Sequence, residues 1–389
     1  MASRTSTSAE SRRLVARRTR ADTAVVTGHS RAVLALIPVA LLLVIGAGAL
    51  MSASSVIALH ENGDRMYLFN RHLMFIGIGV FALLITARVP YRLYERWAIP
   101  IFLLSLVALV TTLAIGKSID GATRWVTIGG VSLQLSEFSK FATVVMLAAI
   151  FSRENKRFLR FRGVFIPVAF VFGSSGLLLL AQPDFGTVLI VAGAGFAVLI
   201  ASKAPLRWVG AMMALGGVAG AFLAQSAPYR MQRILSFRDP LADPLGNGLQ
   251  AVQSLVALGT GGLFGVGLGA SRARWRFLPN AHNDFIFAII GEEMGLVGSL
   301  AVVSLFLLFS LVGVQLALRI DDMFGRLLAI GMVAWISTQA LVNIGGVAAI
   351  LPISGVPLPF VSAGGSAMIA NLAAVGVLIN LSRTQRTES

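Results

Sequence analysis

Long apolar runs recur along the chain from residue 32 almost to the C-terminus, with shorter polar segments between them. A stretch of about 20 apolar residues is long enough for an α-helix to cross a bilayer. Only helices and closed barrels satisfy their backbone hydrogen bonds in lipid. The pattern therefore predicts an all-α polytopic membrane protein with ten transmembrane helices, near residues 32–53, 73–87, 98–115, 138–151, 164–181, 187–201, 209–224, 285–318, 327–351 and 366–381.

Composition supports a membrane protein and excludes several other classes. The 389 residues are 56% hydrophobic and only 13% charged, whereas a soluble domain carries about 25% charged residues. The absence of cysteine excludes disulfides and thiolate metal sites, and four histidines are too few for a histidine-rich metal centre. A net charge of +15 would suggest nucleic acid in a soluble protein, but here it lies mainly in tails and loops. We therefore expect anionic lipid as the partner and no nucleic acid.

The basic residues also predict orientation and domain boundaries. Residues 1–31 are rich in Ser, Thr and Arg, without the apolar run of a cleavable signal peptide, which predicts a disordered basic cytoplasmic tail. Ten spans place both termini on one side, and that side holds most of the 32 Lys and Arg. The positive-inside rule then places both termini in the cytoplasm. We expect a membrane domain over residues 32–382 and a short cytoplasmic tail over 383–389.

One connection, over residues 225–283, is far longer than the others and is predicted to lie outside the cell, between the seventh and eighth helices. Long loops in compact folds are usually functional. A short helix is expected over residues 249–258, followed by a Gly-rich stretch over 259–269. With no preceding strand, those glycines are weak evidence for dinucleotide binding. Their N–H groups could cradle a pyrophosphate, although a flexible loop or close packing is the commoner use.

Asp284 stands where the long loop meets an apolar helix. A carboxylate there could act as a general base toward a sugar hydroxyl. It could equally be a helix N-cap, for which Asp is favoured.

A second charged group lies within the apolar runs. Glu137 and Lys140 share a helix face because they are three residues apart. Charges inside a membrane pair with one another or face a cavity, so a structural ion pair and a functional pair are both open. Asp184 could be their third partner or the N-cap of the next helix.

Several outward-facing residues suit phosphate or sugar. Guanidinium groups bind phosphate oxygens, and tryptophans stack on sugars or anchor at the membrane interface. Glu292 and Glu293, inside the eighth span, need polar partners or water. The basic and aromatic candidates are Arg124, Trp125, Arg272, Arg274, Trp275 and Arg276.

Five segments stand out in order along the chain: Gly121–Trp125, Gln134–Lys140, Gln182–Thr187, Leu278–Gly295 and Pro352–Ser366. Taken together and in order, they resemble the SEDS family, whose members include FtsW, RodA and SpoVE. The stretch 278–293 looks closer to the division members, FtsW, than to RodA. One departure is Ala363, where many relatives have tyrosine, so no role is expected for that hydroxyl.

The resemblance implies a peptidoglycan glycosyltransferase that polymerises lipid II during cell division and releases undecaprenyl pyrophosphate. The family's essential acid falls on Asp284. A divalent cation, Mg²⁺ or Mn²⁺, is the candidate cofactor, bound by residues still unknown. Class B penicillin-binding proteins and other division proteins are the expected partners, at the septal plasma membrane. Substrate binding is expected from Arg124, Trp125, Glu137, Lys140, Asp184, Arg272, Arg274, His282, Ser362, Gly364 and Gly365.

Three alternatives stay open. A lipid II flippase would use Glu137, Lys140 and Asp184 to line a substrate path. An elongation polymerase of the RodA type would perform the same chemistry in another process. A division scaffold would dock proteins through its basic tail and would not need Asp284.

Overall fold

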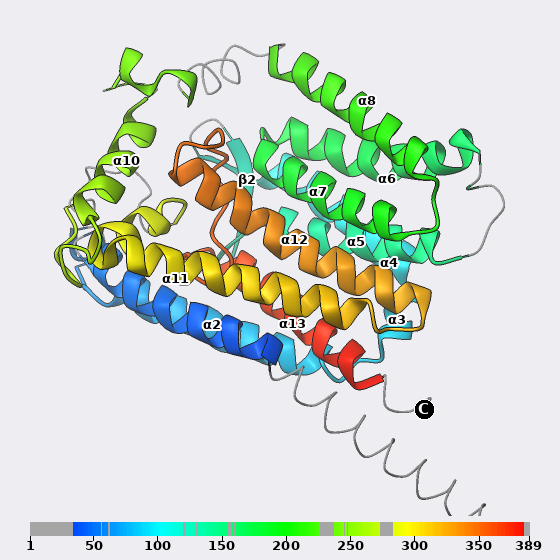
Figure 1. Cartoon of the computed structure of the whole chain (residues 1–389), viewed down its shortest axis with the longest axis horizontal. Helices are drawn as coiled ribbons and strands as arrows, with labels where there is room; N and C mark the ends of the chain where they lie inside the picture. Colours follow the sequence, from blue (N-terminus) through cyan, green and yellow to red (C-terminus); the bar gives the residue numbers. More distant parts are fainter. Residues whose placement is uncertain are drawn as a thin grey trace, which may run out of the picture.

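The computed structural model describes residues 34–55, 57–60, 63–119, 122–129, 131–153, 158, 160–225, 237–244, 246, 248–272 and 283–384. Within them the chain forms a bundle of helices packed side by side (Figure 1). A helix over Leu34–Ser55 comes first. The later helices are α2 (Tyr67–Thr86), α3 (Tyr91–Arg96), α4 (Ala98–Ile115), α5 (Ser136–Phe151), α6 (Phe161–Ala181), α7 (Phe185–Ala201), α8 (Leu206–Gln225), α10 (Leu249–Gly261), α11 (Ile286–Ala317), α12 (Met323–Val347) and α13 (Gly365–Thr384), with a 3₁₀ turn η2 (Pro240–Ala242).

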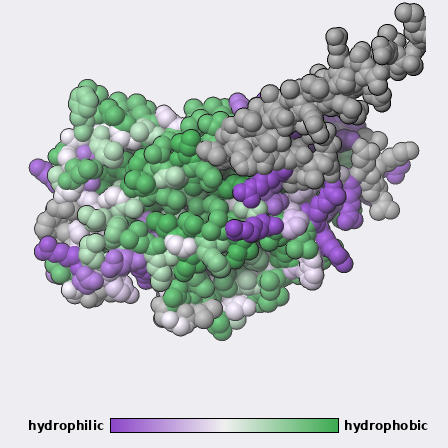
Figure 2. All heavy atoms as spheres, turned by 90° about the horizontal axis from the view of Figure 1, so that it is seen from below, coloured by the Kyte–Doolittle hydropathy of each residue, from purple (hydrophilic) through white to green (hydrophobic). Residues whose placement is uncertain are grey.

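The bundle has the surface of a membrane protein. Seven helices in the described residues are long and apolar enough to span a bilayer, and α7 and most of α8 form shorter apolar helices. Large apolar side chains such as Phe81, Val107 and Phe222 are more than half exposed. Figure 2 shows a broad apolar region over the middle of one face, with polar side chains gathered toward the ends. The predicted polytopic all-α fold is confirmed, and the number of ten helices stays a prediction.

Three helices form most of the protein interior. Within their most apolar 18 residues, 67% of α12 and 72% of α13 are buried, against 17% of α2. The α12 helix packs on α5, α7 and α11, and α13 packs along α2. In α5 only three of its residues are not buried. Polar side chains on α5 and α12 are therefore shielded from both lipid and water.

A small antiparallel sheet lies between α4 and α5, where the sequence predicted only an outward-facing connection. It consists of β1 (Lys117–Ile119), β2 (Ala122–Ile128) and β3 (Val131–Leu133), in that order. Gly129 has a φ of 57° in the turn between β2 and β3, a conformation that glycine adopts without strain. The sheet holds Arg124 and Trp125 on β2, at the end of the bundle that carries Asp284.

Helix α11 is broken near its start, within the run 285–318 predicted as one span. Gly295 has φ 68° and ψ −162°, which interrupts the helical hydrogen bonds. The segment after α10 replaces them: Leu296 N donates to Gly262 O at 2.9 Å, and Val266 N donates to Glu292 O at 2.9 Å. A Cβ on Gly295 would lie 2.4 Å from Gly265 N, so only glycine permits this approach. The Gly-rich stretch thus serves close packing.

Candidate functional site

Asp284 is held at the start of α11 by the neighbouring helix α12. The amide of Asn343 donates through Nδ2 to the backbone oxygen of Asp284 at 2.8 Å and to that of Val356 at 2.7 Å. One side chain thereby joins the start of α11 to the loop after α12. Phe285, not Asp284, is the N-cap residue of α11, and it makes no side-chain cap bond. The capping interpretation of Asp284 is therefore wrong.

Arg124 approaches the same loop from the sheet. Gly355 in that loop has a φ of 69°, and a Cβ added to it would lie 3.6 Å from Asp284 Oδ2 and 3.9 Å from Arg124 Nη1. The carboxylate and the guanidinium therefore both border the position of one missing side chain. A carboxylate and a guanidinium that are 160 positions apart in the sequence thus both lie near Gly355, at one end of the bundle.

The guanidinium of Arg124 is fixed by α7 and the turn before it. Its Nη1 lies 3.9 Å from Asp184 Oδ1, its Nε donates to Gln182 O at 3.4 Å, and its Nη2 donates to Pro183 O. The side chain is 15% exposed. The guanidinium of Arg124 is thus held in one orientation and is still partly accessible to a ligand, which suits a group that binds an anion.

Asp184 caps α7 and also ties it to α5. Its carboxylate accepts from Thr187 N at 3.3 Å and Ser136 Oγ at 3.1 Å. Gln134 Nε2 is a weaker donor at 3.4 Å. The predicted cap is confirmed. The same carboxylate links Arg124 to the first turn of α5, one residue from Glu137.

Glu137 and Lys140 form the predicted ion pair inside the bundle. Lys140 Nζ lies 2.7 Å from Glu137 Oε2 and donates to Gln339 Oε1 at 2.7 Å. It also lies 5.4 Å from the ring centroid of Trp335. Lys140 and Glu137 are 1% and 2% exposed. The third partner of the pair is Gln339, whereas Asp184 makes its ion pair with Arg124.

Two amide side chains on α12 were not singled out from the sequence. Gln339 accepts from Trp335 Nε1 at 3.0 Å and donates to Pro357 O at 2.9 Å, while Asn343 supports Asp284. The two are four residues apart, on one face of α12. The sequence does contain evidence for both residues, because two amides at helical spacing within an apolar run need buried partners.

Glu292 and Glu293 accept hydrogen bonds from the segment that follows α10 and from Ser52. Glu292 accepts from Arg272 N at 3.0 Å and from Ser271 Oγ, and Glu293 accepts from Ser52 Oγ and from Ser271 N at 3.4 Å. Both acids are 3% exposed. These four bonds come from hydroxyl and backbone donors, and the side chain of Arg272 itself is exposed. Arg274, Trp275, Arg276 and His282 lie outside the described residues.

The three candidates before α13 have packing contacts. Ser362 Oγ accepts from Leu358 N at 2.8 Å, which closes a turn. A Cβ on Gly364 would lie 3.1 Å from Pro357, and one on Gly365 would lie 2.5 Å from the Phe75 ring. These contacts seat the start of α13 against α2 and its own loop, and binding of substrate by these residues stays a prediction.

An apolar groove of about 470 Å³ includes part of this polar region. Its lining comes from α2, α3, α4, α5, α13 and the end of β3, and is mostly apolar. Glu137, Gln134 and Tyr94 are among its polar members. Such a groove matches an extended hydrocarbon chain attached to a polar group.

The site offers carboxylates but no preformed metal centre in the part of the chain that the structure describes. Within those residues no three His, Cys, Asp or Glu side chains converge. Mg²⁺ is commonly held by one or two carboxylates together with substrate phosphates. Asp284 beside Arg124 therefore fits a cation that arrives with a phosphorylated substrate.

Fold and site together define a polytopic helical membrane protein with an acid and a guanidinium at one end and a buried ion-pair network beneath them. A family model described as cell cycle protein, covering FtsW, RodA and SpoVE, matches residues 32–387. The chain belongs to this FtsW/RodA/SpoVE family.

Named relatives and solved structures agree with the family. Stage V sporulation protein E of Bacillus subtilis is 38% identical over 351 residues, covering 89% of this chain and 95% of that protein. "Probable peptidoglycan glycosyltransferase FtsW" of Geobacter metallireducens is 38% identical over 333 residues, covering 85% and 89%. A chain from a peptidoglycan synthase complex that coordinates polymerization and crosslinking matches with a TM-score of 0.75 at 27% identity, covering 91% and 98%. Thermus thermophilus RodA matches at 0.67 and 26%, covering 91% and 97%.

Proposed function

We propose that this chain is a peptidoglycan glycosyltransferase that polymerises lipid II, with Asp284 as the general base. Family membership supports the reaction class, and relatives carry that activity in their names. The observation that carries the assignment is that the side chains of Asp284 and Arg124 both lie within 4 Å of a Cβ built on Gly355. A carboxylate can accept the proton of an attacking hydroxyl, and a guanidinium can neutralise a departing pyrophosphate.

The chemistry follows from these two groups. The acceptor lipid II presents a sugar hydroxyl to Asp284, which takes its proton as the hydroxyl oxygen attacks the anomeric carbon of the growing chain. A new glycosidic bond forms, the bond from that carbon to the pyrophosphate oxygen breaks, and undecaprenyl pyrophosphate leaves with the electron pair. Arg124, fixed by Asp184, stabilises the charge that develops on the leaving group. No nucleophilic side chain takes part.

The apolar groove suits the lipid portion of this substrate. Its lining combines apolar residues of the bundle with Glu137 and Gln134. Gln134 in turn donates to Asp184, the partner of Arg124. An isoprenoid chain in the groove would bring its pyrophosphate toward these polar residues.

A divalent cation is the proposed cofactor. Asp284 and the substrate's pyrophosphate oxygens would hold Mg²⁺ or Mn²⁺, which would add positive charge next to the leaving group. We further propose a class B penicillin-binding protein as the transpeptidase partner, together with other division proteins at the septal plasma membrane. The FtsW names among the relatives favour a division role over elongation.

The rival function is transport of lipid II, because the buried charged residues could line a path. The two functions can be distinguished in detergent, because a flippase there has no second membrane face to which it could move lipid II. Purified chain incubated with lipid II should release one undecaprenyl pyrophosphate for each glycosidic bond formed. A flippase would leave lipid II chemically unchanged, and that result would contradict the proposal.

The proposed orientation places both termini in the cytoplasm and Asp284 outside. The chain contains no cysteine, so single cysteines can report topology directly. We expect a membrane-impermeant thiol reagent to label intact cells carrying Arg238→Cys and to leave those carrying Arg160→Cys unlabelled until the membrane is opened. The reverse pattern would overturn the orientation.

Substitution of Gly355 should reduce activity by blocking the space between Asp284 and Arg124. In Gly355→Val a branched side chain would enter that space on a backbone with φ 69°. Small displacements of reacting groups can cost up to about 100-fold in rate, so we expect a loss of about 10- to 100-fold in polymerisation per folded molecule.

Gly63→Val is the matched control for this prediction. Gly63 also has a positive φ, 73°, but a Cβ there would meet no atom within 4 Å. It carries the same kind of backbone strain without touching the site. Equal activity of the two folded variants would show that Gly355 does not border the reacting groups.

A further inference from the structure

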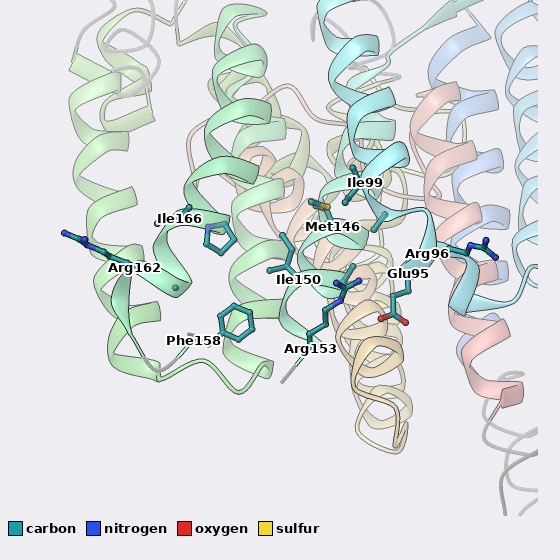
Figure 3. Close-up of a pocket in the computed structure, with 13 residues that line it drawn as sticks. Glu95, Arg96, Ile99, Met146, Ile150, Arg153, Phe158, Arg162 and Ile166 are labelled. Atoms are coloured by element: carbon teal, nitrogen blue, oxygen red, sulfur yellow. The ribbon is translucent and has the colours of Figure 1, made fainter. Parts of the chain in front are cut away.

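A second cavity opens at the end of the bundle opposite Asp284, between α4, α5 and α6 (Figure 3). Its volume of about 430 Å³ lies within the range of about 300–1,000 Å³ that is usual for small-ligand sites. Apolar side chains form its walls, among them Ile99, Met146 and Ile150. These residues belong to helices of the membrane bundle, so the interior of the cavity is suited to hydrocarbon.

Charged side chains surround the mouth of this cavity. Arg96, Arg153 and Arg162 outnumber one carboxylate, Glu95. Figure 3 shows Arg153 extending alongside the apolar walls, while Arg96 and Arg162 flank the cavity and point away from it. No ion pair joins Glu95 to these arginines among the described residues. The mouth therefore favours an anion, and Arg153 is the residue placed to contact it.

A proline interrupts the backbone hydrogen bonds of α6 beside this cavity. Pro167 lies inside α6 and has no N–H, so the carbonyl of Gly163 lacks its α-helical donor four residues later. Gly163 and Pro167 both line the cavity. A hydroxyl group of a bound molecule could donate to this carbonyl.

We propose that this cavity is a binding site for one anionic phospholipid with a hydroxylated headgroup, of the phosphatidylglycerol type. An acyl chain covers the apolar walls, the phosphate lies against Arg153, and a headgroup hydroxyl donates to Gly163 O. Arg96 and Arg162 add the positive field that draws anionic lipid to the mouth. The site is separate from the proposed catalytic residues and does not depend on the proposed function.

The site can be tested by native mass spectrometry of the purified full-length chain in detergent, titrated with dioleoyl phosphatidylglycerol. The parent should retain one lipid molecule at concentrations where further lipids dissociate. Arg153→Gln should raise the dissociation constant about tenfold or more, as expected when a charge-assisted hydrogen bond to phosphate is lost. Arg153→Lys should keep much of the affinity. The control Arg319→Gln, an exposed arginine outside the lining, should bind as the parent does.

Three results would overturn the proposal. One is equal affinity of the parent and Arg153→Gln, both folded, for phosphatidylglycerol. Another is equally tight binding of dioleoyl phosphatidylethanolamine, whose ammonium group could pair with Glu95. The third is competition by free glycerol phosphate at concentrations similar to those of the lipid, which would show that the apolar walls hold no acyl chain.

Discussion

Asp284→Asn is expected to abolish polymerisation while leaving the fold intact. The backbone oxygen of Asp284 accepts from Asn343 Nδ2, and this bond survives the substitution. An amide cannot take the proton from the attacking hydroxyl. General-base catalysis typically contributes about 10²- to 10⁴-fold, so the rate of glycan formation from lipid II should fall by at least about 100-fold, with normal expression and normal thermal stability.

Asp239→Asn provides the matched control for this substitution. Asp239 is an exposed acid in the long loop between α8 and α11. The same chemical change there should leave the rate near that of the parent. Should Asp284→Asn polymerise lipid II at close to the parental rate, the assignment of the general base would be wrong.

Lys140→Ala is expected to have the largest effect on stability. The substitution leaves Glu137, 2% exposed, without its cation and removes the donor to Gln339. Removing one partner of a buried ion pair typically costs about 3–5 kcal/mol. We expect a lower folded yield, a thermal unfolding midpoint reduced by several degrees, and loss of activity because α5 also carries Ser136, the partner of Asp184.

Two further variants separate charge burial from the loss of a side chain. Lys117→Ala removes an exposed lysine in β1 and should leave the midpoint unchanged. The double variant Glu137→Gln, Lys140→Met leaves no buried charge at the pair and should recover part of the lost stability. A normal midpoint for Lys140→Ala alone would contradict a buried, mutually dependent pair.

The sequence predicted those features that depend on local spacing. Apolar runs of bilayer length predicted the membrane helices, and the short helix over 249–258 is confirmed as α10. The spacing of Glu137 and Lys140 predicted their pairing, since residues three apart share a helix face. Asp184 could be placed at an N-cap because it precedes an apolar helix after a proline.

Features that depend on distant parts of the chain could not be predicted. The pairing of Arg124 with Asp184 requires the sheet, and the sheet forms from short strands in a segment without strong alternation. The break at Gly295 depends on the backbone of residues 262–267, which supplies the missing hydrogen bonds. Asp284 looked like a cap because helix boundaries read from a sequence are uncertain by a few residues. In the structure its carboxylate instead faces Gly355, beside Arg124.

The most direct test of the central claim is the length of glycan made from lipid II by the purified chain in detergent, resolved on a gel without any transpeptidase active. We expect polymers many disaccharides long, formed both with the chain alone and, more rapidly, with its penicillin-binding partner. Recovery of only monomeric lipid II under conditions where the chain is folded and the partner is bound would contradict the proposed polymerase activity.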